Sequence, residues 1–144
     1  MTKEVMVTIS GLQIAEAEQD TVELVHIGEY YERNGTHYIF FDELLEGIPE
    51  PVKNVIKIKD RCLEVQKKGP VVTKLVFEEG KSQRSTYTIP FGSFLIETST
   101  NSVQVHQGEE RLEAAVAYGL EINGAHCADC DIRVLVQTKE SFRL

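Results

Sequence analysis

A short run of metal-binding residue types, residues 126–131 with the sequence His-Cys-Ala-Asp-Cys-Asp, is the first place where this chain could do chemistry. Two cysteines separated by two residues can offer two thiolates to zinc, and a neighbouring imidazole or carboxylate can add a third ligand. Structural zinc normally takes four ligands, and the sequence contains no second cysteine pair of this kind. We therefore predict no metal site, keep His126, Cys127 and Cys130 as weak candidates, and interpret the run as a polar hairpin loop.

Two of the histidines pair with carboxylates if the chain folds back at Asn34-Gly35. This dipeptide favours a two-residue type I′ turn, and the resulting register places His26 opposite Glu43 and His37 opposite Glu32. An imidazole held by a carboxylate can transfer protons in catalysis, but such pairs more often serve the structure. The sequence contains no G-x-S-x-G motif, no phosphate-binding loop and no dinucleotide-binding fingerprint. We therefore assign no catalytic residue and favour a protein without enzymatic activity.

The hairpin at Asn34-Gly35 belongs to a pattern of alternating apolar and polar residues that continues almost to the C-terminus. Such alternation indicates strands with one buried face, and the close spacing of the turns leaves little room for parallel crossovers. The sequence therefore predicts an all-β antiparallel meander that closes into a barrel, with a turn or two of helix possible at residues 12–20. The predicted strands are residues 5–10, 22–33, 36–44, 52–59, 62–68, 72–78, 82–89, 91–100, 103–107, 111–122 and 132–138.

Two connections fix which side chains share a face. If Asp60-Arg61 forms a two-residue turn, Ile58 lies opposite Leu63 and both point to the same side of the sheet. For Phe77 on the next strand to share that buried face, the connection that begins at Gly69 must contain an odd number of residues. We predict a loop of three residues there.

The charge of the chain limits its partners. A net charge of −8 argues against nonspecific nucleic-acid binding, which depends on neutralising phosphates. The region from Lys53 to Arg84 is nevertheless basic, with nine Lys or Arg residues and four Asp or Glu residues. The simplest interpretation is a solvated outer face, and the alternative is a patch that binds a small anion or a partner.

Length and cysteine usage indicate one domain in a reducing compartment. A chain of 144 residues can bury a sizeable core without disulfides. Its three cysteines, an odd number, do not suggest a secreted disulfide framework. The N-terminus lacks the apolar run of a signal peptide, and no stretch is long enough to span a bilayer. We therefore expect a cytoplasmic protein.

The predicted barrel interior holds several polar and aromatic side chains. Aromatic residues on strands usually belong to the core, but inward tyrosine and histidine also provide the mixed apolar and hydrogen-bonding lining that a ligand pocket requires. We expect such a pocket near the end of the barrel that holds His26 and Glu43. The candidate ligand-binding residues are His26, Tyr30, His37, Phe41, Glu43, Tyr87 and Tyr118.

Five motifs recur in the order of a known family: G-E-Y-Y at 28–31, N-G-T-H-Y-I at 34–39, K-x-G ending at Gly69, L-V-F-E-E-G at 75–80 and Y-T-I-P-F-G at 87–92. Together they resemble the YwiB-like family of bacterial proteins of unknown function, which is similar to the calycins. The resemblance spans nearly the whole chain and implies one lipocalin-like β-barrel of about 8–10 strands over residues 1–144. The family tends to have Arg where Lys67 stands and Thr where Ile89 stands, and Lys cannot reproduce a guanidinium fork.

These observations favour a cytoplasmic β-barrel that binds an unidentified small molecule without catalysis and without a cofactor. The alternative is a protein-interaction module that uses the basic region from Lys53 to Arg84 or an exposed sheet edge. An enzyme is the third and least favoured interpretation. We expect no nucleic-acid partner and no membrane association, and the sequence does not define an oligomeric state.

Overall fold

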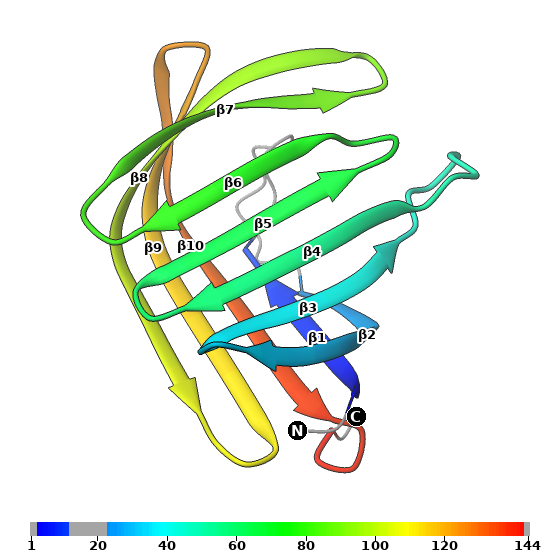
Figure 1. Ribbon diagram of the computed structural model, residues 1–144. Helices are drawn as coiled ribbons and strands as arrows, with labels where there is room; N and C mark the ends of the chain where they lie inside the picture. Colours follow the sequence, from blue (N-terminus) through cyan, green and yellow to red (C-terminus); the bar gives the residue numbers. More distant parts are fainter. Residues whose placement is uncertain (1–2, 12–22, 143–144) are drawn as a thin grey trace.

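The protein is an antiparallel β-barrel (Figure 1). The computed structural model describes residues 3–11 and 23–142. Consecutive strands in this part of the chain pair with each other at every step but one, and the first strand also pairs with the last, from Val5 opposite Thr138 to Ser10 opposite Arg133. The strands are β1 (Glu4–Ser10), β2 (Glu23–Arg33), β3 (Thr36–Glu43), β4 (Val52–Lys59), β5 (Cys62–Lys68), β6 (Thr73–Glu78), β7 (Ser82–Ile89), β8 (Gly92–Gln107), β9 (Arg111–Ile122) and β10 (Ala125–Thr138). The predicted meander is therefore confirmed.

The barrel has a seam between β6 and β7, the one pair of consecutive strands that does not form a ladder among the described residues. An isolated bridge joins them near one end, where Val72 and Thr88 exchange two backbone hydrogen bonds of 2.9 Å. At the other end the chain turns from β6 into β7. The order of strands around the sheet thus begins at β6 and ends at β7, which leaves the wall weakest between them.

Near each turn the register is the one that the sequence predicts, but the β2–β3 ladder ends before the predicted pair of His26 and Glu43, and His26 lies opposite Val7 on β1 instead. Asn34 and Gly35 both have positive φ angles, 52° and 79°, and the β2–β3 ladder runs from Arg33 opposite Thr36 to Glu29 opposite Phe40. Ile58 lies opposite Leu63 across the Asp60-Arg61 turn. Phe77 lies opposite Leu63 in turn, so the connection contains an odd number of residues as predicted, although the ladder ends at Lys67 opposite Thr73 and the predicted three-residue loop is not itself shown.

Two predicted boundaries are wrong. Residues 91–100 and 103–107 form one long strand, β8, which continues past a bulge between Thr100 and Ser102 instead of turning. Strand β10 begins at Ala125, so the run at residues 126–131 lies in a strand and not in a hairpin loop. The long partner β9 explains this extension, because its backbone groups need a neighbour whatever the polarity of the facing side chains. The predicted helical segment, residues 12–20, lies outside the described residues.

Apolar side chains fill the interior of the barrel. Nearly every strand contributes buried residues, and the largest pair is Phe77 and Tyr118, whose ring centroids lie 4.8 Å apart. Strand β7 is the exception among the described strands, since its Tyr87 is only half-buried and packs against the edge of the core. Few apolar contacts therefore hold β7 against β6.

In the described part of the chain, no helix combines the length and apolarity needed to cross a membrane.

Candidate functional site

A row of polar side chains crosses the inner face of the barrel on three adjacent strands. Asn54 on β4 lies directly opposite Lys67 on β5, and Lys67 lies directly opposite Thr73 on β6. All three are buried, with exposed fractions of 2%, 7% and 4%. Phe41 on β3 precedes them in the same row, opposite Asn54. We call Asn54, Lys67 and Thr73 the polar row.

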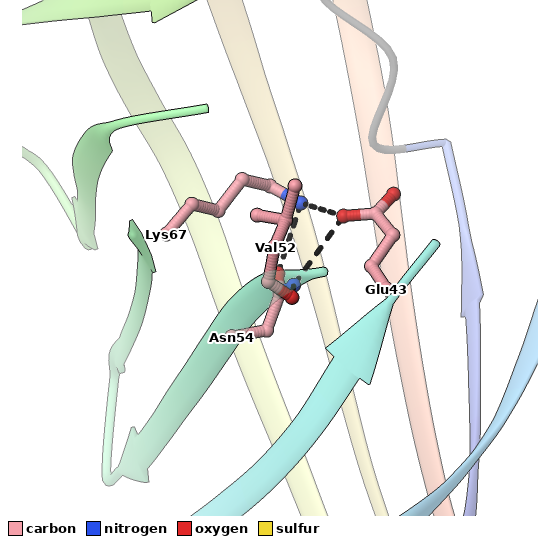
Figure 2. A network of polar contacts seen from close by, with 4 residues as sticks. All are labelled: Glu43, Val52, Asn54 and Lys67. Atoms are coloured by element: carbon pink, nitrogen blue, oxygen red, sulfur yellow. Dashed lines mark hydrogen bonds and ion pairs between the residues drawn. The ribbon is translucent and has the colours of Figure 1, made fainter. Parts of the chain in front are cut away.

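The ammonium group of Lys67 is held by two partners on neighbouring strands (Figure 2). It donates to Glu43 Oε1 at 2.8 Å and to Asn54 Oδ1 at 2.9 Å. The Asn54 amide in turn donates to the same Glu43 oxygen at 3.3 Å and to the Val52 carbonyl oxygen at 3.2 Å. Each amide and charge therefore has a partner, which is what allows a lysine to remain inside a barrel.

Glu43 is ionised because of this network. Burial by itself would raise the pKa of its carboxyl group, but the charge of Lys67 and the hydrogen bonds from Lys67 and Asn54 outweigh burial and lower the pKa. The site consequently holds a carboxylate and an ammonium as an ion pair. The Glu43 side chain keeps 18% of its surface exposed, and the Lys67 side chain keeps 9%.

The polar row retains two hydrogen-bond donors that are not used by the described residues, one hydroxyl and one N–H. The hydroxyl of Thr73 is buried without a hydrogen bond. The ammonium of Lys67 has three donors, and two of them are used by Glu43 and Asn54. A buried polar group without a partner costs free energy, so its presence calls for an explanation.

The seam between β6 and β7 contains an opening beside these groups. It has a volume of about 360 Å³. Along each strand alternate side chains point inward and outward, and the lining includes residues of both sets, among them the buried Lys67 and Thr73. We call it the window; it is lined by Gln66, Lys67, Lys68, Val72, Thr73, Lys74, Gln83, Arg84, Ser85 and Thr86.

The window is positively charged. Lys67, Lys68, Lys74 and Arg84 line it, and no carboxylate of the described residues does. The carboxylates that pair with three of these cations lie outside the lining. Glu43 is 2.8 Å from Lys67, Glu64 is 3.7 Å from Lys74, and Glu97 is 2.9 Å from Arg84. The hydroxyl of Ser85 donates to the Lys74 carbonyl oxygen at 2.7 Å, a side-chain bond that spans the seam between the two strands.

Four of the seven predicted ligand-binding residues gather near the polar row. The imidazole of His26 stacks on Phe41 with centroids 4.5 Å apart, and Glu43 is close enough to act on its charge. Burial lowers the pKa of His26, and this effect exceeds the opposing one of Glu43. Burial and then the charge of Glu43 raise the pKa of Tyr87 to about 12. None of these four residues lines the window. Glu43 is connected to it because it binds Lys67, which does line it.

The other three predicted residues lie elsewhere. The Tyr30 hydroxyl and His37 Nδ1 are 2.7 Å apart, so His37 bonds to Tyr30 and not to Glu32, the residue opposite it in the register. His37 is six residues from Glu43 along β3, or about 20 Å. Tyr118 is buried against Phe77, and its hydroxyl has no hydrogen bond of normal geometry among the described residues. The predicted set is thus divided among three regions of the interior.

The cysteine pair lies on β10, far from a chelating arrangement. A bulge between His126 and Ala128 interrupts the ladder, Cys127 is exposed, and Cys130 is half-buried opposite Tyr118. Burial raises the pKa of the Cys130 thiol. Residues three apart on a strand are separated by about 10 Å along it, whereas two thiolates on one zinc ion each lie about 2.3 Å from the metal. Among residues 3–11 and 23–142, no group of three or more potential ligands is arranged for a metal ion.

The polar row was missed because lysine and asparagine on strands normally indicate a solvated face. A signal nevertheless exists in the sequence. Asn54 is in phase with the buried Ile56 and Ile58, and Lys67 is in phase with Leu63 and Val65. A polar residue that keeps the phase of a buried face is a candidate for an internal site.

Comparisons with known proteins agree with a β-barrel and assign no activity. The family model described as "Domain of unknown function (DUF1934)" matches residues 7–134. The chain is 27% identical over 124 residues to the uncharacterized beta-barrel protein YwiB of Bacillus subtilis (strain 168), across 85% of this chain and 86% of that protein. The crystal structure of the ywiB protein from Bacillus subtilis matches with a TM-score of 0.74 and 23% identity, covering 96% of this chain and 94% of the other.

Proposed function

This chain belongs to the DUF1934 family, whose function is unknown, and we propose that it binds a small polar molecule at the window between β6 and β7, without catalysis. The observation that carries the proposal is the buried hydroxyl of Thr73, a residue that lines the window and whose hydroxyl has no partner among the described residues. A ligand that enters the window supplies the missing hydrogen bond. The window, with a volume of about 360 Å³, is large enough for one small ligand.

The strand arrangement supports entry at this point. Every other pair of neighbouring strands described in the wall forms a ladder, whereas β6 and β7 share only the Val72–Thr88 bridge and the Ser85 hydrogen bond. Because β7 contributes no fully buried apolar residue among those described, moving it costs little core packing.

The three free cysteines fit our further proposal that the protein acts in the cytoplasm.

The proposal can be tested by mapping where small molecules bind to the full chain. Native mass spectrometry of freshly purified protein first tests for a retained ligand. A panel of small polar molecules of each charge class is then titrated while backbone amide resonances are followed by NMR. We expect at least one molecule to shift resonances of β6 and β7 around the window.

Two tryptophan variants sharpen this experiment. Gln83→Trp fills the window from its rim, and Gln104→Trp places the same side chain on an exposed site of β8 that does not line it. Binding should be lost in the first variant and kept in the second. The proposal is wrong if no molecule is retained or bound, or if binding maps to another surface in both variants.

A second candidate function rests on the edge of β2. Pairing of β2 with β3 stops at Glu29, so residues 23–28 have no ladder partner on that side among the described residues. Val25 and Ile27 on this stretch are 44% and 61% exposed. A depression of about 340 Å³ lies beside it, lined in part by Ile27 and Phe40. An extended segment of a partner protein could add to this edge, and resonance shifts confined to β2 would favour that function over the first.

A further inference from the structure

We propose that the group that enters the window is an oxyanion, a carboxylate or phosphate carried by a small molecule, and that Lys67 and Thr73 bind it. This inference rests on the proposed binding function and names the chemical class of its ligand. It follows from the distribution of charge and of unused hydrogen-bond donors around the window.

The charge of the lining favours an anion over a cation or a neutral molecule. Four cationic side chains border the opening, and no carboxylate of the described residues does. The partners of Lys74 and Arg84 hold them weakly, because these cationic side chains are 59% and 78% exposed and exposed ion pairs contribute little. Both cations can therefore turn toward a ligand. Lys68 is exposed at the same rim.

The inner end of the window offers donors to an anion. Lys67 retains one N–H beyond those that bond to Glu43 and Asn54. Thr73, directly opposite Lys67 on the next strand, retains its hydroxyl hydrogen. Charge-assisted hydrogen bonds to an oxyanion are stronger than neutral ones, and burial strengthens them further.

Glu43 determines which face of the ammonium is available. Its carboxylate binds Lys67 from inside the barrel and does not line the window, so the repulsion between Glu43 and a bound anion is screened by the ammonium between them. Figure 2 shows the Lys67 side chain extended toward Glu43, with the Asn54 amide below their contact and bonded to both. The cations at the rim offset the remaining repulsion.

Binding of defined probes tests the inference. Inorganic phosphate and acetate represent the two oxyanion classes, glycerol represents a neutral polar molecule, and tetramethylammonium represents a cation. Each is titrated into the full chain at constant ionic strength, with backbone NMR shifts at the window as the readout. We expect phosphate, acetate or both to bind at the window and glycerol and tetramethylammonium not to bind.

Three variants assign the binding to the named groups. Thr73→Val removes one donor without changing charge and should weaken oxyanion binding roughly tenfold. The double variant Lys67→Met with Glu43→Gln removes both charges of the ion pair together and should abolish binding. Lys59→Met removes an exposed lysine that does not line the window, and its affinity should stay within about twofold of that of the wild type. If the double variant does not fold, Thr73→Val carries the test alone.

The possible results separate this inference from the proposed function. Binding of glycerol or tetramethylammonium at the window, without phosphate or acetate, overturns the oxyanion class and leaves the binding function standing. Oxyanion binding that is unchanged in Thr73→Val overturns the assignment of the site. If no probe affects the window and no ligand is retained after purification, both proposals are wrong.

Discussion

Lys67 and Thr73 lie directly opposite each other on β5 and β6, yet the Lys67 ammonium is held by two partners and the Thr73 hydroxyl by none of the described residues. Toward β4 and β3, Lys67 bonds to Asn54 and Glu43. Toward β7, the strands do not form a ladder, and the window lies between them. A core selected only for stability would place apolar residues at both positions. The contrast between these two neighbours indicates that part of the interior is kept polar for something other than folding.

Replacing Thr73 with valine should therefore stabilise the protein. The change removes a buried hydroxyl that has no hydrogen bond to the described residues, and we expect the free energy of unfolding to rise by about 1 kcal/mol. Thr138→Val is the matched control, because the Thr138 hydroxyl bonds to Ser141 at 3.1 Å and its loss should cost about 1 kcal/mol. Urea denaturation measures both. A destabilised Thr73→Val protein would mean that the hydroxyl already has a partner.

Breaking the internal ion pair should cost more than removing it whole. Lys67→Met leaves Glu43 without its cation, and we expect a loss of about 2 to 3 kcal/mol, below the cost for a fully buried pair because Glu43 is partly exposed. Adding Glu43→Gln should restore stability to within about 1 kcal/mol of the wild type. A double-mutant cycle in urea gives the coupling. Additive losses in the two single variants would show that the pair contributes nothing to folding.

The sequence predicted the path of the chain better than its interior chemistry. Turn residues such as Asn34-Gly35 impose positive φ angles, and one buried face then fixes the register, so the hairpins could be derived from local rules. The merging of two predicted strands into β8 depends on a bulge at Asn101, which replaces the expected turn and is set by pairing with β9.

The window could not be predicted for a different reason. It depends on the incomplete pairing of β6 and β7, which are neighbours in sequence and are joined by a short connection like that of a hairpin. Whether two such strands pair or separate is decided by the curvature of the whole barrel. Of the residues predicted for the pocket, His26 and Glu43 lie near Lys67, which lines the window, but neither of them lines it.

Acidification should reveal the environment of His26. Its pKa in the folded protein is lowered below the ordinary value of 6.5, mainly by burial, so the unfolded chain binds the proton first as pH falls. The stabilising effect of neutral His26 is complete above about pH 6.5 and is lost as pH falls through the folded pKa. His26→Phe, which keeps a ring against Phe41, should show a shallower loss of stability below pH 6.5 in urea titrations. If the free energy of unfolding falls as steeply with pH in this variant as in the wild type, His26 is not the group responsible for the loss of stability.

The two cysteines on β10 should be dispensable for folding. Cys127 is exposed and Cys130 is half-buried on a strand, so replacing both with serine removes little packing. We expect an unchanged far-ultraviolet circular dichroism spectrum and a melting temperature within about 2 °C of the wild type. Stoichiometric zinc in the purified wild-type protein, or unfolding of the double variant, would contradict this expectation.

Gly28 should tolerate no side chain, because of how closely β2 is packed at this point. A Cβ atom there would lie 2.8 Å from the Phe40 carbonyl oxygen and 3.0 Å from Val7 Cγ2, and the first of these contacts involves backbone that cannot rotate away. We expect Gly28→Ala to cost about 2 kcal/mol in the free energy of unfolding. Gly119→Ala on β9 is the matched control, since a Cβ atom at Gly119 would lie 3.8 Å from its nearest neighbour, Asp129 Oδ1. Its stability should stay within about 0.5 kcal/mol of the wild type. Equal stability of the two variants would mean that β2 and β3 separate at Gly28 more widely than the structure indicates, and that the edge of β2 is correspondingly more open to a partner.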